Sequence, residues 1–411
     1  MEKLQNELTF ENKTEMGNEK PNWPQFNNRE KELILEVLES RKWWRMNGDK
    51  VVNFEKKFAE CHGAEYCLAV TNGTHALELS LASLEIGKGD EVIVPAITFI
   101  STATAPIYNG ATPVPVDCDP QTFCINADAI EAAITPKTKA IIPVHMAGHP
   151  CDMDKICEIA KKHKLKIIED AAHAHGAEWR NKRIGTFGEF AIFSFQNGKI
   201  MTSGEGGAII TNSKELYEKA FLIHTVGRPK FDKVYEHIEL GSNYRMNEFQ
   251  AAILLAQLER LEEQNRIREK NAKTLDNLLK NIDGITSQGR DSRVSLNTHY
   301  MYMFYYDSKE FNGMLREEFV QLLNDSGIPA FICFPIVSRT EFFEKGKFRS
   351  HLLKQEVRNK YSLPNSEAIA NNVVWLPHFL LLGNESFINQ IADTIGDIKK
   401  QAMETKRDEA K

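Results

Sequence analysis

The sequence predicts an α/β fold: a large domain with a mostly parallel central sheet flanked by helices, then a smaller C-terminal α+β domain. Short apolar strands alternate with helical segments between residues 66 and 224, a rhythm typical of parallel sheets covered by helices on both faces. The character of the sequence changes after Gly284, and 411 residues exceed what one hydrophobic core usually holds. We therefore expect a large domain over residues 21–283 and a small domain over residues 284–411.

The N-terminal part is expected to be a tail followed by helices. Residues 1–20 are rich in Glu, Asn and Lys, and we interpret them as a flexible tail. Apolar residues then recur at helical spacing between residues 28 and 60. Residues 42–48 interrupt this pattern with two tryptophans and a glycine, which indicates a loop that covers another part of the molecule.

The alternating part of the chain gives the expected sheet and its covering helices. The expected strands are 66–70, 92–96, 112–116, 140–145, 166–170, 190–195 and 208–211. The expected helices are 75–84, 99–108, 127–134, 154–163 and 213–224. Residues 92–116 carry no charge and are long enough to raise the question of a membrane span. They contain four prolines and four threonines, so we interpret them as two buried strands and a helix.

The C-terminal part has a different pattern. Asn247 can cap a long helix that runs to about residue 281 with apolar residues on one face. Beyond Gly284 we expect an edge-like strand at 300–306, a helix at 317–324, a strand at 330–334 and a closing helix at 387–398.

Composition excludes several classes of partner. The net charge is −6 and no basic tract stands out, so neither nucleic acid nor an anionic membrane is an expected partner. The seven cysteines form no Cys-x-x-Cys pair, and their odd number indicates free thiols in a reducing compartment. The first twenty residues lack the apolar core of a signal peptide, so we expect a cytoplasmic protein.

One lysine and one carboxylate point to a specific cofactor. Lys199 lies on a loop between two expected strands, and Asp170 ends another expected strand. A lysine that condenses with an aldehyde and a carboxylate that keeps a pyridine nitrogen protonated are the groups required by pyridoxal 5'-phosphate chemistry. Taken alone, Lys199 would be a solvated loop lysine and Asp170 a helix cap or metal ligand. Their joint occurrence favours the cofactor, and Asp170, Thr74 and Ser194 all fall at or close to expected strand ends, where ligands bind in such sheets.

The turn between the first strand and its helix is a candidate phosphate site. Gly73 and Thr74 offer exposed amides, a hydroxyl and the positive end of a helix to a phosphate dianion. Ser194 offers a second hydroxyl, and Phe99 could stack on the pyridine face. An ordinary helix N-cap has the same glycine pattern, and an aromatic residue at position 99 is more often part of a core.

Histidines at positions 173 and 175, with others at 145 and 149, raise the alternative of a metal site. Histidines two residues apart point away from each other on a helix, and no His-Glu-x-x-His or cysteine pattern accompanies them. We therefore expect no metal, and we expect His173 to bond the phenolic oxygen of the cofactor.

These residues resemble the DegT/StrS family of sugar aminotransferases, which are fold-type-I pyridoxal phosphate enzymes. The resemblance covers roughly residues 22 to 400 and rests on motifs at 72–77, 90–95, 143–145, 169–176, 194–199, 204–207 and 241–246. It implies a homodimer with the active site at the interface. It also implies that Lys199 is the Schiff-base lysine, Asp170 the pyridinium partner and Phe99 the ring-stacking aromatic. Thr74 and Ser194 match phosphate ligands, and Asn243 matches the asparagine that reaches the phosphate of the neighbouring subunit's cofactor.

Departures from the family pattern narrow the branch. Most members carry Gln where His173 stands, and family dehydratases carry His in place of the lysine, so Lys199 argues against that branch. The segments 43–46, 145–148, 172–175 and 195–199 look most like 3-amino-5-hydroxybenzoate synthases, and the surrounding pattern is similar to scyllo-inosose-type aminotransferases. The C-terminal part around residues 334–336 matches neither subgroup cleanly.

The resemblance implies an aminotransferase that moves an amino group from glutamate or glutamine to a ketone on a sugar or cyclitol, in amino-sugar or natural-product biosynthesis. The alternative is a 3-amino-5-hydroxybenzoate synthase-type enzyme that dehydrates and aromatises an aminoshikimate-like ring. A regulator that binds the cofactor without turnover is a third hypothesis, but only about twenty residues precede the matched region, too few for a DNA-binding module. A metal-dependent hydrolase built on the histidines is the fourth.

Overall fold

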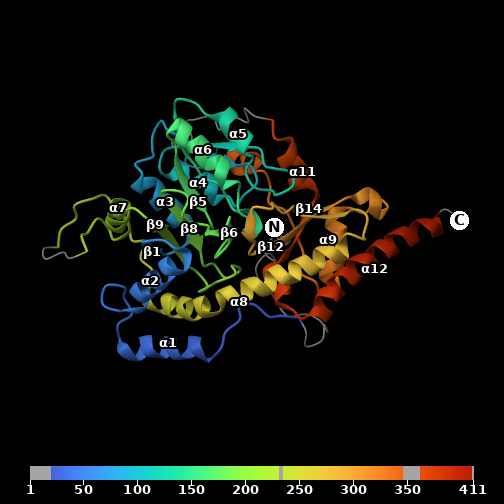
Figure 1. Cartoon of the computed structure of the whole chain (residues 1–411), viewed down its shortest axis with the longest axis horizontal. Coiled ribbons are helices and arrows are strands. Elements are labelled where there is room, and N and C mark those ends of the chain that lie inside the picture. Colours follow the sequence, from blue (N-terminus) through green and yellow to red (C-terminus); the bar gives the residue numbers. More distant parts are fainter. Residues whose placement is uncertain (1–19, 231–234, 346–361, 410–411) are drawn as a thin grey trace.

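The computed structural model describes residues 20–230, 235–345 and 362–409, and the tail expected over residues 1–20 lies outside them except for Lys20. Two sheets lie side by side, and one long helix, α8 (Glu248–Leu279), runs beneath both of them (Figure 1). None of the helices in these ranges is long and apolar enough to cross a membrane.

The larger sheet carries the predicted site. Within the described part of the chain it has seven strands in the order β1-β9-β8-β5-β4-β2-β3. Only β9 runs antiparallel to its neighbours, which confirms the mostly parallel sheet. The strands are β1 (Tyr66–Val70), β2 (Glu91–Pro95), β3 (Thr112–Val116), β4 (Thr138–Ile141), β5 (Lys166–Asp170), β8 (Phe190–Ser194) and β9 (Gly207–Thr211).

Helices cover both faces of this sheet, and each face has its own apolar core. One core includes side chains from α3, α4 and α7, and the other includes side chains from α1, α2, α5, α6 and α8. The helices are α1 (Asn28–Ser40), α2 (Lys50–His62), α3 (Gly73–Ser83), α4 (Ser101–Tyr108), α5 (Ala127–Ala133), α6 (Met153–His163) and α7 (Lys214–His224). The predicted alternation of strands and helices is therefore confirmed.

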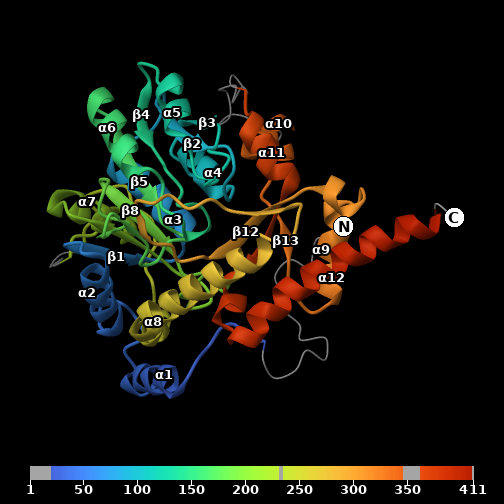
Figure 2. The same cartoon turned by 45° about the vertical axis from the view of Figure 1, so that its right-hand side comes forward.

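The second sheet has the order β10-β12-β14-β13 in the described residues, and a turn of the view shows it beside α9 and α12 (Figure 2). Its strands are β10 (Ile285–Ser287), β12 (Met301–Tyr306), β13 (Phe331–Ile332) and β14 (Val373–Pro377). The helices of this part are α9 (Arg316–Asp325), α10 (Glu341–Lys345), α11 (Pro364–Asn372) and α12 (Glu385–Glu409). Short strands β6 (Glu178–Trp179), β7 (Lys182–Arg183) and β11 (Val294–Leu296) form a third sheet.

A strand forms at residues 301–306 as expected, but the prediction that it lies at a sheet edge is wrong. β12 lies inside the second sheet, with β10 on one side and β14 on the other. The reason is β14, which the sequence analysis did not predict and which pairs with β12 from Met301↔Pro377 to Tyr305↔Val373. All but one of the β12 side chains are buried as a result.

The long helix belongs to both cores. Its N-terminal part packs into a core of the large sheet, whereas Ala272, Leu275 and Leu279 near its C-terminal end pack with the second sheet. Asn247 caps the helix, because its side chain accepts a hydrogen bond from the backbone N–H of Gln250. The predicted helix to about residue 281 is confirmed within two residues.

Candidate active site

Most of the predicted site residues lie at the carboxyl-terminal ends of strands of the large sheet. Asp170 is the last residue of β5, and Ser194 is the last residue of β8, which pairs with β5. Lys199 follows β8 on a loop, and Gly73 begins the helix after β1. Because these strands run parallel, their ends lie at one edge, where open α/β sheets bind ligands.

Asp170 is buried and held in place by two donors. The Thr102 hydroxyl donates to Oδ2 at 2.9 Å, and the backbone N–H of Ala172 donates to Oδ1 at 3.2 Å. Burial raises the pKa of Asp170, and the Thr102 hydrogen bond, the Ala172 amide and the charge of Lys199 oppose that rise. A cationic ring nitrogen beside the carboxylate would favour its ionised form further. Thr102 was not predicted as a site residue.

Lys199 is partly buried on the loop after β8. Burial lowers the pKa of its amine to about 8, with the Asp170 charge acting in the opposite direction. A lysine with such a pKa has a useful fraction of neutral, nucleophilic amine near neutral pH. Its Nζ lies 4.3 Å from the centroid of the Tyr300 ring, so a residue from the second half of the chain closes one side of the site.

His173 presents an unfilled nitrogen to the same site. Its ring is buried and stacks on Tyr300, with centroids 4.3 Å apart and planes inclined by 24°. Burial, and then the charge of Lys199, holds the pKa of His173 well below its usual range, so the ring is neutral. Its buried Nδ1 makes no hydrogen bond within the described residues. A neutral ring with an unused nitrogen fits the phenolic oxygen of pyridoxal phosphate.

The turn between β1 and α3, which contains Gly73 and Thr74 and is called the phosphate turn below, is closely packed. Gly73 is the first residue of α3, and a Cβ added there would lie 2.9 Å from the Cβ of Ser194, so the turn and Ser194 are in direct contact. The hydroxyls of Thr74 and Ser101 lie 2.7 Å apart. Amides at a helix N-terminus with hydroxyls beside them fit a phosphate group. Ser101, at the start of α4, was not predicted.

Two predicted residues lie apart from this group. Phe99 is 55% exposed and lies just before α4. The first two residues of that helix are Ser101 and Thr102. Asn243 is exposed and pairs with Thr225 through a backbone bridge. The ring-stacking role of Phe99 and the cross-subunit role of Asn243 therefore stay predictions.

The histidines have other partners than a metal. Nε2 of His175 donates to the Ser194 carbonyl at 2.9 Å, and Nε2 of His145 lies 3.3 Å from a Glu169 oxygen. Within the ranges that the structure describes, no group of three or more His, Cys, Asp or Glu side chains could hold a metal ion.

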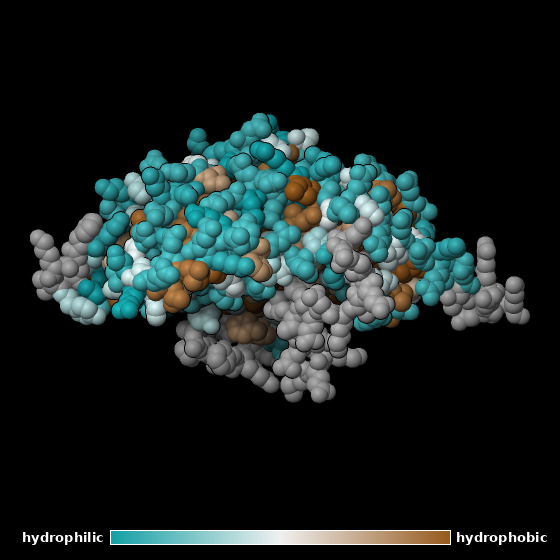
Figure 3. Space-filling model, turned by 90° about the horizontal axis from the view of Figure 1, so that it is seen from below, coloured by the Kyte–Doolittle hydropathy of each residue, from teal (hydrophilic) through white to brown (hydrophobic). Residues whose placement is uncertain are grey.

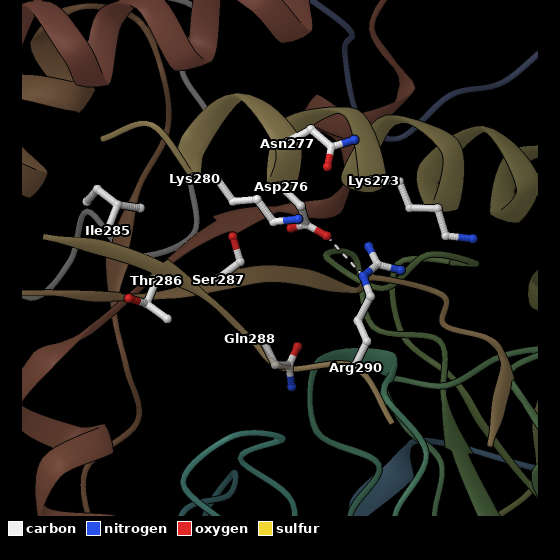
Figure 4. A pocket seen from close by; sticks show the side chains of 9 residues that line it. All are labelled: Lys273, Asp276, Asn277, Lys280, Ile285, Thr286, Ser287, Gln288 and Arg290. Carbon is white, nitrogen blue, oxygen red and sulfur yellow. Dashed lines mark hydrogen bonds and ion pairs between the residues drawn. The ribbon is translucent and has the colours of Figure 1, made fainter. Parts of the chain in front are cut away.

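A separate cavity of about 640 Å³ lies between the end of α8 and β10 (Figure 4). It is lined by Lys273, Asp276, Asn277, Lys280, Ile285, Thr286, Ser287, Gln288 and Arg290. None of the predicted site residues lines it. Asp276 and Arg290 form an ion pair at 2.9 Å, so part of its charge is already compensated.

Comparison with known proteins gives consistent results along nearly the whole chain. A model of the DegT/DnrJ/EryC1/StrS aminotransferase family matches residues 24–395. A 3-amino-5-hydroxybenzoate synthase of Amycolatopsis mediterranei is 45% identical over 387 residues, covering 93% of this chain and 98% of the relative. An L-glutamine:2-deoxy-scyllo-inosose aminotransferase of Micromonospora echinospora is 36% identical over 392 residues, covering 90% and 92%.

A solved structure of 3-amino-5-hydroxybenzoic acid synthase superposes with a TM-score of 0.85 at 44% identity and covers 93% of this chain and 99% of that one. The packed phosphate turn, the unfilled nitrogen of His173 and the lysine–aspartate pair fit the cofactor of such enzymes. The chain therefore belongs to the DegT/DnrJ/EryC1/StrS aminotransferase family and is a pyridoxal phosphate-dependent aminotransferase.

Proposed function

We propose that this enzyme transfers an amino group from glutamate or glutamine to a ketone on a sugar or cyclitol, in amino-sugar or natural-product biosynthesis. In this proposal Lys199 and Asp170 are the catalytic residues, and the cofactor is bound by Gly73, Thr74, Phe99, His173, Ser194 and Asn243. The observation that carries the proposal is the Lys199 amine. Its pKa is lowered to about 8, and it lies on a loop at the same edge of the sheet as buried Asp170.

When bound, pyridoxal phosphate supplies an aldehyde that condenses with amines and a ring that withdraws electrons from the substrate α-carbon. The residues of this chain do the rest. Lys199 takes and returns the proton at Nζ, a role that contributes about 10²–10⁴-fold to the rate. Asp170 holds the pyridine nitrogen in its protonated state. Thr74 and Ser194 anchor the phosphate, and neutral His173 orients the phenolic oxygen.

The acceptor class is supported by the relatives, which include an aminotransferase named for 2-deoxy-scyllo-inosose. The purified enzyme incubated with glutamate or glutamine should lose the absorbance of its cofactor–lysine form and gain that of pyridoxamine phosphate. Adding the correct ketone should reverse the change. No spectral change with either donor would contradict transamination. Nucleotide-linked keto sugars, free keto sugars and inososes, tested in parallel, would identify the acceptor.

The second candidate is dehydration and aromatisation of an aminoshikimate-like ring. The 45% identity to a 3-amino-5-hydroxybenzoate synthase along almost the entire chain favours it. Both candidates use the same lysine, so the product decides between them. Formation of an aromatic amine from an aminoshikimate-type substrate, without any amino donor, would support this second candidate over the first.

We also propose that the active enzyme is a homodimer with the site at its interface. Several large apolar side chains on α1 and the following loop are exposed in the single chain: Leu35, Leu38, Trp43, Trp44 and Met46. Seen from the side on which α1 lies, hydrophobic patches interrupt a largely hydrophilic surface (Figure 3). Such patches are typical of protein contacts, and exposed Asn243 is then available to a neighbouring cofactor.

A cytoplasmic location belongs to the same proposal. All seven cysteines are unpaired, and five of them are buried. Free thiols in this number persist in a reducing compartment. Fractionation of producing cells should recover the activity in the cytosolic fraction, and recovery from the periplasm or medium would contradict this location.

A further inference from the structure

In the segment just before Lys199, every backbone carbonyl from Ser194 to Gly198 accepts a hydrogen bond. Two of the five are bonded locally: the Phe195 carbonyl accepts from Ser203 and Thr202, and the Gln196 carbonyl accepts from the Lys199 amide. The other three, at Ser194, Asn197 and Gly198, accept from aromatic rings outside the loop. This loop therefore depends on side chains from elsewhere for its conformation.

The three ring donors come from distant parts of the chain. Nε1 of Trp23 donates to the Asn197 carbonyl at 2.9 Å, across 174 positions. Nε2 of His378 donates to the Gly198 carbonyl at 3.1 Å, across 180 positions. Nε2 of His175 donates to the Ser194 carbonyl at 2.9 Å. Trp23 precedes α1, His175 follows β5, and His378 follows β14 in the second sheet.

The two histidines are set to donate from Nε2. Carbonyls only accept, so each Nε2 carries the hydrogen, and each buried Nδ1 is bare and makes no hydrogen bond within the described residues. Burial holds the pKa of both rings well below the usual range, and the positive charge of buried Arg268 lowers both further. Arg268 also lies 5.8 Å from the centroid of the Trp23 ring.

Two of the three donors also contact each other. The rings of Trp23 and His378 meet edge to face with centroids 4.4 Å apart. His378 lies over the Tyr300 ring at 6.0 Å, and Tyr300 in turn contacts both His173 and the Lys199 amine. Trp23 and His378 thus form one packed pair beside the loop, whereas the His175 ring packs against Phe193 and Phe195 at the end of β8.

We propose that Trp23, His175 and His378 are positioning residues for Lys199, acting through hydrogen bonds to the carbonyls of its loop. This inference rests on the role proposed above for Lys199. It follows that the N-terminal segment and the second sheet both determine where the amine lies. A small displacement of a reacting group is costly, of the order of 10²-fold for about 1 Å.

Trp23→Phe tests the indole donor, because it keeps an aromatic ring and removes the N–H. We expect kcat to fall about tenfold with little change in KM. We also expect the pH midpoint of the cofactor–lysine absorbance to shift by about half a unit, because the environment of the amine changes. Trp375→Phe is the matched control: its Nε1 donates to the Ile332 carbonyl at 3.0 Å within the second sheet, away from the loop. That variant should keep both values.

His378→Phe and His378→Gln form the second pair. The phenylalanine removes the donor, whereas the glutamine amide can replace it, so we expect the loss in the first and substantial recovery in the second. The inference is overturned if Trp23→Phe, folded as judged by circular dichroism, keeps kcat within twofold and an unshifted pH midpoint. An equal loss in Trp375→Phe would also overturn it. Borohydride labelling of the wild type at Lys199 separates this outcome from failure of the proposed function.

Discussion

Lys199 and Asp170 are tuned by the same cause in opposite senses. Burial disfavours the charged form of each, so it lowers the pKa of the lysine to about 8 and raises the pKa of the carboxyl, while their mutual attraction opposes both shifts. The lysine is therefore easily neutralised, and a cation beside the carboxyl would favour its ionised form. A protonated pyridine nitrogen is such a cation.

The lowered pKa of Lys199 predicts how the apoenzyme recombines with pyridoxal phosphate. Only the neutral amine attacks the aldehyde, so the second-order rate should rise about tenfold per pH unit and level off near pH 8. An ordinary lysine would continue to gain neutral amine up to about pH 10.4. Stopped-flow absorbance measures this profile, and a rate still rising steeply at pH 9.5 would contradict the burial of the amine.

Asp170→Asn should bind some cofactor but lose at least about 10²-fold in kcat, because an amide cannot hold the pyridine nitrogen protonated. Thr102→Val should lose less, roughly threefold to tenfold, since it removes one hydrogen bond to Oδ2 of Asp170. Steady-state kinetics with a saturating donor measures both. Near-normal turnover of Asp170→Asn would contradict the role of the carboxylate.

At the residue scale, sequence patterns predicted groups that lie next to strand ends and missed those that reach the site from elsewhere. Asp170 and Ser194 end their strands, Gly73 and Thr74 lie in the turn after β1, and the structure brings all four to one edge of the sheet. Tyr300 lies about a hundred residues beyond Lys199, and no local pattern connects the two. Thr102 lies one turn into the helix predicted over residues 99–108. The threonines of the uncharged run 92–116 were therefore the one sequence feature that could have indicated a hydroxyl near Asp170.

Among the elements, the contact between the start of β9 and the phosphate turn depends on a glycine. A Cβ at Gly207 would lie 2.4 Å from the carbonyl carbon of Asn72 and 2.8 Å from the backbone nitrogen of Gly73. Backbone atoms cannot move aside as a side chain can. Gly207 therefore allows the strand to approach the turn closely enough to pack under α3.

Gly207→Ala should weaken cofactor binding about tenfold, because the added methyl group displaces the amides at the start of α3. Gly396→Ala in α12 is the control, since its Cβ would meet only Ile282 at 3.9 Å. The control should bind the cofactor as the wild type does. Equilibrium titration of the apoproteins with pyridoxal phosphate measures both, and unchanged affinity in Gly207→Ala would contradict the packing argument.

The large sheet could be predicted element by element because each strand and helix has its own periodicity. The second sheet could not. β14 directly follows α11 without a turn signal, since α11 ends at Asn372 and β14 begins at Val373. Without that strand, β12 had no visible partner on one side and was placed at an edge. Pairing between distant segments, rather than local propensity, decided this part of the fold.

For the whole molecule, the division of the chain stays a prediction. We propose the boundary near residue 283, where α8 has ended and β10 follows. The last turns of α8 contribute Ala272, Leu275 and Leu279 to the core around the second sheet. The long helix therefore packs in the cores of both parts. The sequence change after Gly284 shows where the second part begins, but it does not show that the helix before it already belongs to both.

The proposed shared site predicts complementation between inactive subunits. Lys199→Ala and Asn243→Ala homodimers should each have little activity. Mixed dimers should regain activity, because one of their two sites combines an intact Lys199 with an intact Asn243 from the other subunit. Co-expression with two affinity tags isolates the mixed species for assay. No recovery in mixed dimers, or full activity of the Asn243→Ala homodimer, would contradict the cross-subunit role.

The most direct measurement is reduction of the holoenzyme with borohydride, followed by peptide mapping of the pyridoxyl label. The account predicts one label per chain, on Lys199, and a Lys199→Ala protein that keeps its fold but takes up no label and shows no cofactor–lysine absorbance. A label on any other amine, or none in active enzyme, would contradict the claim that Lys199 holds the cofactor.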